Sequence, residues 1–251
     1  MLTRGEIKYI QSLQDKKHRD AERRFVAEGT KWIDELIKWQ PGWIEKIYAS
    51  ETWAKEHNGH ILSEKLEVVK DFEMEKISAL SHPAPALALV KKPIYTHQAF
   101  DEDHWNLVLD GIQDPGNMGT IIRIADWFGL KAIWCSSDTV DAFNPKVVQS
   151  AMGSLCRVKV FYADLEDLLS VTDLPICITG MEGRNVFETK AHSGILVIGN
   201  EGKGVRPGVT SKASHTLSIP RIGHAESLNA AVATGIMIAR LTAGREPSKG
   251  H

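Results

Sequence analysis

Short apolar runs alternate with helical segments through the second half of the chain. The runs, each long enough for a strand, are WNLVLD (105–110), KAIWCSS (131–137), RVKVF (157–161), PICIT (175–179), GILVIGN (194–200) and TLSIP (216–220). Continuous apolar strands that alternate with helices are typical of a parallel sheet covered on both faces. We therefore predict an α/β domain over 105–246.

The first part of the chain has shorter and more mixed elements. Its pattern predicts an amphipathic helix over 6–14 and strands at FVAEG (25–29), IEKIYAS (44–50), LEVVKD (66–71) and ALALVKK (86–92). Between the two parts, 93–104 is polar, contains a proline and has no clear period, which indicates a linker. The pattern thus predicts a smaller α/β domain over 1–92 ahead of the larger one.

Composition places the chain among ordinary globular proteins. Of its 251 residues, 43% are hydrophobic and 25% charged, enough for a substantial core. No apolar run approaches the roughly 20 residues that span a bilayer, and the N-terminus MLTRGEIKYIQ lacks the apolar centre of a signal peptide. We therefore predict a cytoplasmic protein. The net charge of −2 gives no global reason to expect nucleic acid, so any such binding must come from a local patch.

The placement of cysteine and histidine argues against disulfides and metal. Cys135, Cys156 and Cys177 are odd in number, widely spaced and set in apolar runs, which is typical of reduced core residues. No CxxC pair occurs and the ten histidines show no ligand spacing, so we predict no metal site.

Three loops rich in glycine and polar residues follow predicted strands: DPGNMG (114–119), GNEGKGV (199–205) and IPRIGHAESLN (219–229). Ligands of open parallel sheets bind outside the carboxyl ends of the strands, so these loops are the candidate site. A P-loop is excluded because Lys203 is followed by Gly204 and not by Ser or Thr. A GxGxxG motif is also absent: Gly202 and Gly204 have its first spacing, but the next glycine is Gly208, one position later than the motif requires. ATP hydrolysis and NAD binding are therefore not favoured, nor is a Rossmann-type oxidoreductase.

The helix expected after the first loop has Arg123, Asp126 and Trp127 on the face opposite its apolar side. That face is either solvated, with an Arg123–Asp126 ion pair, or a surface for a partner, as the large aromatic Trp127 suggests. The third loop leads into SLNAAVATGIMIARL (227–241), which Ser227 can cap. This apolar helix with many small residues is either an ordinary core helix or a subunit interface. Asn229, as a buried amide, needs hydrogen-bond partners.

Together the three loops resemble the three sequence motifs of the SpoU/TrmH branch of the SPOUT superfamily of RNA methyltransferases. The motifs stand here as NMGTIIR (117–123), LVIGNEGKGV (196–205) and IPRIGHAESLNAAVA (219–233), and NPKVVQSAMGSL (144–155) is similar to the segment between motifs. The N-terminal stretch KKHRDAERRFVAEGTKWIDELI (16–37) resembles the start of the family's accessory substrate-binding domain, which is similar to ribosomal protein L30e.

The resemblance implies a fold and a reaction. The fold is a C-terminal α/β knot, a deep trefoil-knotted parallel sheet that forms the S-adenosylmethionine pocket, with a smaller L30e-like α/β domain before it. The reaction moves a methyl group from S-adenosylmethionine to a ribose 2′-hydroxyl of structured RNA, in a homodimer that joins through the knotted domain. Ribosomal RNA is favoured as substrate over tRNA; a non-catalytic RNA-binding protein is the remaining alternative.

The resemblance also implies roles for individual residues. Arg123 would lie near the target hydroxyl, either as a base or, because guanidinium holds its proton, as a clamp on the adjacent phosphate. Asn117 would hold the loop or the ribose, Glu201 would anchor Arg123 or the second loop, and Ser227 with Asn229 would complete the catalytic set. The residues expected around the cofactor are Thr179, Gly180, Ile198, Gly199, Asn200, Glu201, Gly202, Ile219, Pro220 and Leu228.

The basic stretch KKHRDAERR (16–24) is the best local patch for RNA. A charge run of this kind is otherwise an ordinary solvated face. Its position in the domain that resembles a substrate-binding module favours RNA. The residues predicted to contact RNA are Lys16, Lys17, Arg19, Arg23 and Arg24, together with Arg123.

Overall fold

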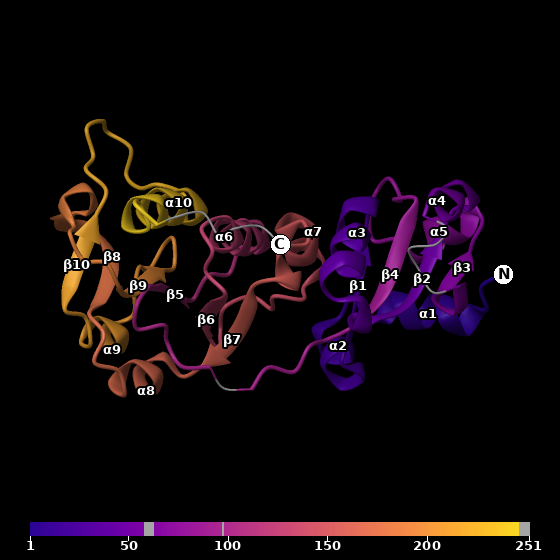
Figure 1. Cartoon of the computed structure of the whole chain (residues 1–251), viewed down its shortest axis with the longest axis horizontal. Helices are drawn as coiled ribbons and strands as arrows, with labels where there is room; N and C mark the ends of the chain where they lie inside the picture. The colour runs from indigo at the N-terminus through magenta and orange to yellow at the C-terminus, as the bar shows by residue number, and fades with distance from the viewer. Residues whose placement is uncertain (58–62, 97, 246–251) are drawn as a thin grey trace. The chain divides into compact units, whose positions relative to one another are not determined.

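The computed structural model describes residues 1–57, 63–96 and 98–245, which form two compact units (Figure 1). The first unit comprises 1–94 and 141–156, and the second comprises 95–140 and 157 onward. The chain therefore passes between the units three times. The segment 141–156, which the sequence pattern places within the larger domain, makes its contacts in the first unit. Within the described ranges, no helix is long and apolar enough to cross a membrane.

The first unit is built on a four-stranded mixed sheet in the order β1-β4-β2-β3. Strands β1 and β2 pair antiparallel with β4, and β3 pairs parallel with β2. The strands are β1 (Arg24–Glu28), β2 (Ile44–Ala49), β3 (Leu66–Val68) and β4 (Ala86–Lys91). The helices are α1 (Arg4–Ser12), α2 (Lys16–Glu22), α3 (Thr30–Trp39), α4 (Glu51–Glu56), α5 (Asp71–Ile77) and α7 (Pro145–Ala151), with short 3-10 turns η1 (Pro41–Trp43), η2 (Ser63–Lys65) and η3 (Ser154–Cys156).

Helix α7 and the residues before it are tied to this unit by aromatic and polar contacts. The ring of Phe143 lies 4.8 Å, centroid to centroid, from that of Phe25 on β1. The indole Nε1 of Trp32 on α3 donates to the carbonyl of Val148 at 2.6 Å. These groups are buried, so they are removed from water only when 141–156 is in place.

A buried ion pair completes this attachment. Arg19 is 1% exposed; its Nε and Nη2 donate to Oδ2 of Asp141 at 3.1 and 2.8 Å. Its Nη1 donates to the carbonyls of Leu13 and Gln14. All three nitrogens are therefore occupied inside the protein. The prediction that Arg19 contacts RNA is wrong, because its guanidinium is buried in an ion pair with Asp141 that holds α2 to the 141–156 segment.

The second unit contains six strands, all parallel, in the order β10-β8-β9-β5-β6-β7. The strands are β5 (Trp105–Asp110), β6 (Ala132–Ser136), β7 (Lys159–Ala163), β8 (Ile176–Asn185), β9 (Gly194–Gly199) and β10 (His215–Ser218). The helices are α6 (Pro115–Trp127), α8 (Leu165–Ser170), α9 (Pro207–Thr210) and α10 (Ala230–Leu241), with a 3-10 turn η4 (Val186–Glu188). The predicted parallel α/β sheet is confirmed; the knot stays a prediction.

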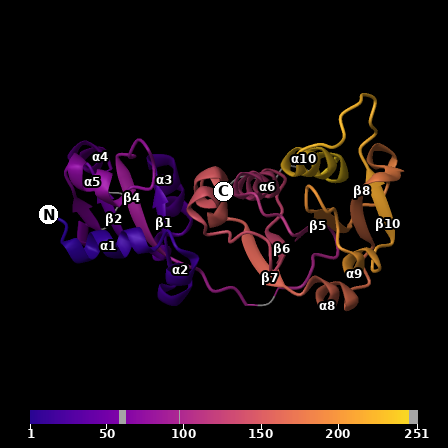
Figure 2. The ribbon, with the colours of Figure 1, turned by 180° about the vertical axis from the view of Figure 1, so that it is seen from behind.

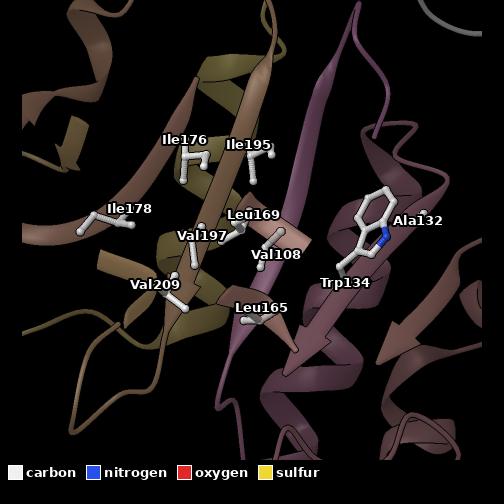
Figure 3. Packing of buried hydrophobic residues seen from close by; sticks show 10 residues of the cluster. All are labelled: Val108, Ala132, Trp134, Leu165, Leu169, Ile176, Ile178, Ile195, Val197 and Val209. Carbon is white, nitrogen blue, oxygen red and sulfur yellow. The ribbon is translucent and has the colours of Figure 1, made fainter. Parts of the chain in front are cut away.

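Both faces of this sheet are covered. Helices α6 and α10 lie on one side and α8 and α9 on the other, in both views of the ribbon (Figures 1 and 2). On the α8 side, Leu165 and Leu169 pack with Val209 of α9 against Val108 and Val197 of the central strands (Figure 3). Each such side chain stabilises the fold by roughly 1.5–3 kcal/mol when fully buried. Because both faces are buried, the strands read in the sequence as continuous apolar runs.

Part of the predicted linker is anchored to the second unit. The ring of Phe100 lies 4.6 Å from that of Trp134 on β6, and the ring of Tyr95 lies 5.6 Å from that of Phe161 on β7. The Asn106 side chain accepts from the backbone of Asp101 and donates to its carbonyl. The three cysteines are free and buried, which confirms their predicted place in the core, and burial raises the pKa of the Cys177 thiol to about 11.

The buried ion pair predicts a large effect on stability. Replacing Arg19 by Met leaves the Asp141 carboxylate buried without its partner, which costs about 3–5 kcal/mol. The free energy of unfolding in urea should fall by that amount. Lys16→Met is the matched control, because its pair with Asp20 is exposed and contributes less than about 1 kcal/mol. Equal losses in the two variants would contradict the role given to Arg19.

Candidate functional site

A large cavity of the second unit lies where the loops after β9 and β10 meet α10. Its volume is about 620 Å³, within the range of cofactor sites. Three chain segments and the first turns of α10 line it. All ten residues predicted to surround a cofactor are among its lining: Thr179, Gly180, Ile198, Gly199, Asn200, Glu201, Gly202, Ile219, Pro220 and Leu228.

An irregularity in β8 brings the first of these segments into the cavity. The pairing with β10 runs from Thr216 opposite Ile178 directly to Leu217 opposite Arg184, so residues 179–183 are left out of the ladder. Glycine is needed within this bulge, because a Cβ at Gly183 would lie 2.6 Å from the carbonyl oxygen of Thr216. The bulge is therefore fixed by the close approach of β10.

Asn200 closes the loop after β9. Its backbone and that of Gly204 exchange two hydrogen bonds, of 3.0 and 2.9 Å. Its side-chain oxygen accepts from the backbone N–H groups of Gly202 and Lys203, and its Nδ2 donates to the carbonyl of Gly111 at 2.8 Å. One side chain thus folds the loop and fastens it to the end of β5.

A chain of side-chain hydrogen bonds joins this loop to two helices. The Nδ2 of Asn117, on the first turn of α6, donates to Oε1 of Glu201 at 2.6 Å. The Oδ1 of Asn117 accepts from Nδ2 of Asn229 at 2.8 Å. Asn229 is in turn the N-cap of α10, since its Oδ1 accepts from the backbone of Ala231 and Val232. Three of the five predicted catalytic residues therefore form one network.

The start of α10 differs from the sequence prediction. Ser227 was expected to cap the helix, but the helix begins at Ala230 and Asn229 is its cap. Ser227 lies two residues earlier, exposed in the lining of the cavity. Asn229 is hydrogen-bonded as predicted, although it is exposed and not buried.

Arg123 lies on the exposed face of α6, without the Asp126 partner that the helix pattern suggested. The ion pair expected between Arg123 and Asp126 is not formed, because the Asp126 carboxylate pairs with Arg157 at 2.8 Å. Nor does Glu201 hold Arg123, since Glu201 accepts from Asn117. Among the described residues Arg123 is exposed and has no hydrogen-bond or ion-pair partner. Its guanidinium is therefore available to an anion from outside the chain.

Sequence reasoning missed a charged cluster that supports the site. Asp110, buried at the end of β5, accepts from the backbone N–H of Arg206 at 2.8 Å and pairs with its Nε at 2.6 Å. The Nη2 of Arg206 pairs with Asp138 at 2.7 Å. The Ser136 hydroxyl and Arg206 together lower the pKa of Asp138. The signal in the sequence was an acid closing the apolar run WNLVLD, since a buried carboxylate requires a partner.

The predicted RNA-binding residues of the first unit are in different surroundings. Lys17 and Arg23 are exposed, and Lys16 is exposed while paired with Asp20. Arg24 is half-buried, and its Nε pairs with Glu45 at 2.6 Å. Arg19 is buried in its ion pair with Asp141 and is not available to RNA.

Two family models match the chain. Residues 104–239 match the SpoU rRNA methylase family, and residues 5–88 match the MRM3-like substrate binding domain. The chain belongs to the SpoU rRNA methylase family. It is therefore an S-adenosylmethionine-dependent RNA 2′-O-ribose methyltransferase.

Relatives cover the whole chain and both units. The chain is 32% identical to the 23S rRNA (guanosine(2553)-2'-O)-methyltransferase RlmP of Bacillus subtilis, over 94% of this chain and 95% of that protein. A TrmH-family structure from Porphyromonas gingivalis superposes with a TM-score of 0.84 at 32% identity, covering 96% and 98% of the two chains. An AdoMet-bound rRNA methyltransferase from Sinorhizobium meliloti gives 0.83 at 29% identity, covering 96% and 95%.

The cavity fits S-adenosylmethionine in kind. Its lining combines the main chain of glycine-rich loops with the apolar side chains of Ile198, Leu228 and Met237. Apolar walls suit an adenine ring, and backbone N–H and C=O groups suit its edge and the ribose hydroxyls. The bound cofactor supplies a methyl group already activated on a sulfonium, so the protein has to place the acceptor and manage one proton.

The closed loop after β9 predicts a strict need for glycine at 199. A Cβ at Gly199 would overlap the backbone of Gly204 and Val205, so Gly199→Ala must open the loop. S-adenosylmethionine binding, measured by calorimetry, should be lost. Gly42→Ala is the control, because nothing lies within 4 Å of its added Cβ. Unchanged cofactor affinity in Gly199→Ala would show that the pocket does not depend on this closure.

Proposed function

We propose that this enzyme methylates a ribose 2′-hydroxyl in ribosomal RNA, with 1–92 as the substrate-binding domain, 93–104 as the linker and 105–246 as the catalytic domain. The observation that carries the substrate class is the likeness to RlmP across nearly the whole chain, the first unit included. Recognition of RNA depends on that unit as much as on the methyl-transfer site. We place the reaction in the cytoplasm, where the enzyme would meet ribosomal RNA.

We further propose that the residues act by positioning. The cofactor is held by the main chain around the cavity, and Arg123 clamps the phosphate beside the target ribose. Asn117, Glu201 and Asn229 fix the loop and both helices relative to one another, and Ser227 lies at the acceptor side. Holding reactants in line in this way supplies several kcal/mol of the barrier reduction. Phosphates elsewhere on the RNA are bound by Lys16, Lys17, Arg23 and Arg24.

The unpaired state of Arg123 predicts a loss confined to transfer. In Arg123→Ala, the rate of methyl transfer should fall by about 100-fold or more because the ribose is no longer held in line. S-adenosylmethionine affinity should be unchanged. Lys212→Ala, which removes an exposed positive charge from the same unit, should keep full activity. Retained turnover in Arg123→Ala would remove it from the mechanism.

The substrate class is tested with separate pools of ribosomal RNA and tRNA from cells that lack this protein. Labelled S-adenosylmethionine and nucleoside analysis then show which pool gains a 2′-O-methyl nucleoside. Label in ribosomal RNA alone is the expected result. Label in tRNA alone would overturn the proposed substrate.

We also propose that the enzyme is a homodimer joined through α6 and α10. These helices contact each other, and each presents a large apolar side chain to solvent: Trp127 on α6 is 84% exposed and Val232 on α10 is 51% exposed. Large apolar side chains exposed on neighbouring helices are typical of an interaction surface. A second copy would cover this face and explain Trp127 on a helix that also carries Arg123.

Charge at this face should dissociate the dimer. Trp127→Glu is expected to weaken self-association by about 30-fold or more, as for a central aromatic of an interface. Sedimentation velocity over a range of concentrations measures it. Val171→Glu is the matched control, since Val171 is 85% exposed at the end of α8, on the other side of the sheet. A monomeric wild-type protein, or a dimer unaffected by Trp127→Glu, would contradict this interface.

A further inference from the structure

A second cavity lies entirely within the first unit, apart from the methyl-transfer site. Its volume is about 380 Å³. It is bounded by the end of α1, by β1, by the turn after α5 and by α7. Its apolar lining includes Ile10, Leu13, Ile77, Leu80 and Val148, and its polar lining includes Gln14, Glu28, Ser81, Lys146 and Gln149.

Glu28 is the one acid in this lining, and its carboxylate can accept more hydrogen bonds than the two that it accepts. The residue is 7% exposed. Its Oε2 accepts from the Ser78 hydroxyl and its Oε1 from the backbone N–H of Ala79, both at 2.7 Å. A carboxylate oxygen can accept two hydrogen bonds, so each retains one acceptor position. Because Glu28 lines the cavity, a donor that enters it meets a carboxylate that two hydrogen bonds hold in place.

We propose that this cavity holds an unstacked guanine of the substrate RNA. Sequence-specific RNA recognition targets bases that are splayed out of helices and read by their edges. Guanine alone places two adjacent N–H donors, N1–H and N2–H, on its Watson–Crick edge. Uracil, cytosine and adenine would each turn an acceptor towards the carboxylate. The proposal rests on the proposed RNA substrate and names a base other than the methylated one.

The remaining lining suits the rest of such a nucleotide. The apolar side chains provide a surface for the flat ring, and the amides of Gln14 and Gln149 can donate to the guanine O6. Lys146 also lines the cavity, and Gln14 is followed closely by the exposed Lys16 and Lys17. Phosphate contacts from these lysines would position the strand, while Glu28 would specify the base.

Binding of short RNAs by the full-length protein tests the proposal. Fluorescence anisotropy is measured with octamers of uridine that carry guanine, adenine or cytosine at one central position. The guanine octamer should bind about 10-fold or more tighter than the others, as for a bidentate edge contact. In Glu28→Gln the preference should disappear while affinity for the uridine octamer stays. Glu75→Gln, an exposed acid on α5, is the matched control.

A second variant guards against a local loss of structure in Glu28→Gln. Gln149→Trp fills the cavity from an exposed position on α7 and leaves the bonds of Glu28 to Ser78 and Ala79 intact. It should also remove the guanine preference. A 6-thioguanine at the central position should crosslink to the peptides that contain 77–81 or 145–150.

No guanine preference in the wild-type protein, or a preference that survives both variants, would overturn the proposal. The measurement needs no methyl transfer, so its outcome is separate from that of the substrate assay. Methylated ribosomal RNA without guanine preference would remove only the pocket. Guanine preference without methylated ribosomal RNA would remove only the proposed substrate.

Discussion

The carboxyl end of β5 is the point on which the methyl-transfer site depends. There the buried carboxylate of Asp110 holds the backbone and side chain of Arg206, and the carbonyl of Gly111 accepts from the Asn200 amide. β5 pairs with β9 on one side and β6 on the other, so it cannot shift without breaking both ladders. Because leaving Asp110 unpaired would cost several kcal/mol, the loop after β9 is held to a strand that is paired on both sides.

Hydrogen bonds between side chains connect this anchored loop to helices α6 and α10. Glu201 lies in the anchored loop, Asn117 in α6 and Asn229 at the start of α10, and each bonds to the next. Arg157 and Arg206 each hold a carboxylate, whereas Arg123 holds none among the described residues. The network thus holds the loop and the two helices together, and the guanidinium of Arg123 on α6 stays available to an anion. That is the arrangement required when catalysis consists of orienting a bound hydroxyl towards a reactive methyl group.

Both faces of the parallel sheet are buried, so each of its strands is a continuous apolar run in the sequence. The strands could therefore be predicted well. The sequence predicted the cofactor residues by resemblance, and they lie around one cavity. It failed where the deciding contact is distant. Arg19 looked like one member of a basic run, yet its partner Asp141 is 122 residues away. Ser227 and Asn229 are both good caps, and what distinguishes them is the hydrogen bond that Asn229 donates to Asn117 on another helix. The bulge in β8 was not predicted, because it depends on how the neighbouring strand β10 pairs with β8.

The two cavities are built from different materials, and the difference bears on how such an enzyme can change its target. The cavity of the second unit is shaped by chain segments in which a Cβ at Gly183 or Gly199 would overlap neighbouring backbone. The cavity of the first unit is lined by side chains, with Glu28 as its one acid. Replacing one of these glycines alters the fold of a loop, whereas replacing Glu28 or Gln149 changes which groups line the cavity of the first unit. Under the roles proposed for the two cavities, single replacements in the first unit would change the selection of RNA without disturbing methyl transfer in the second.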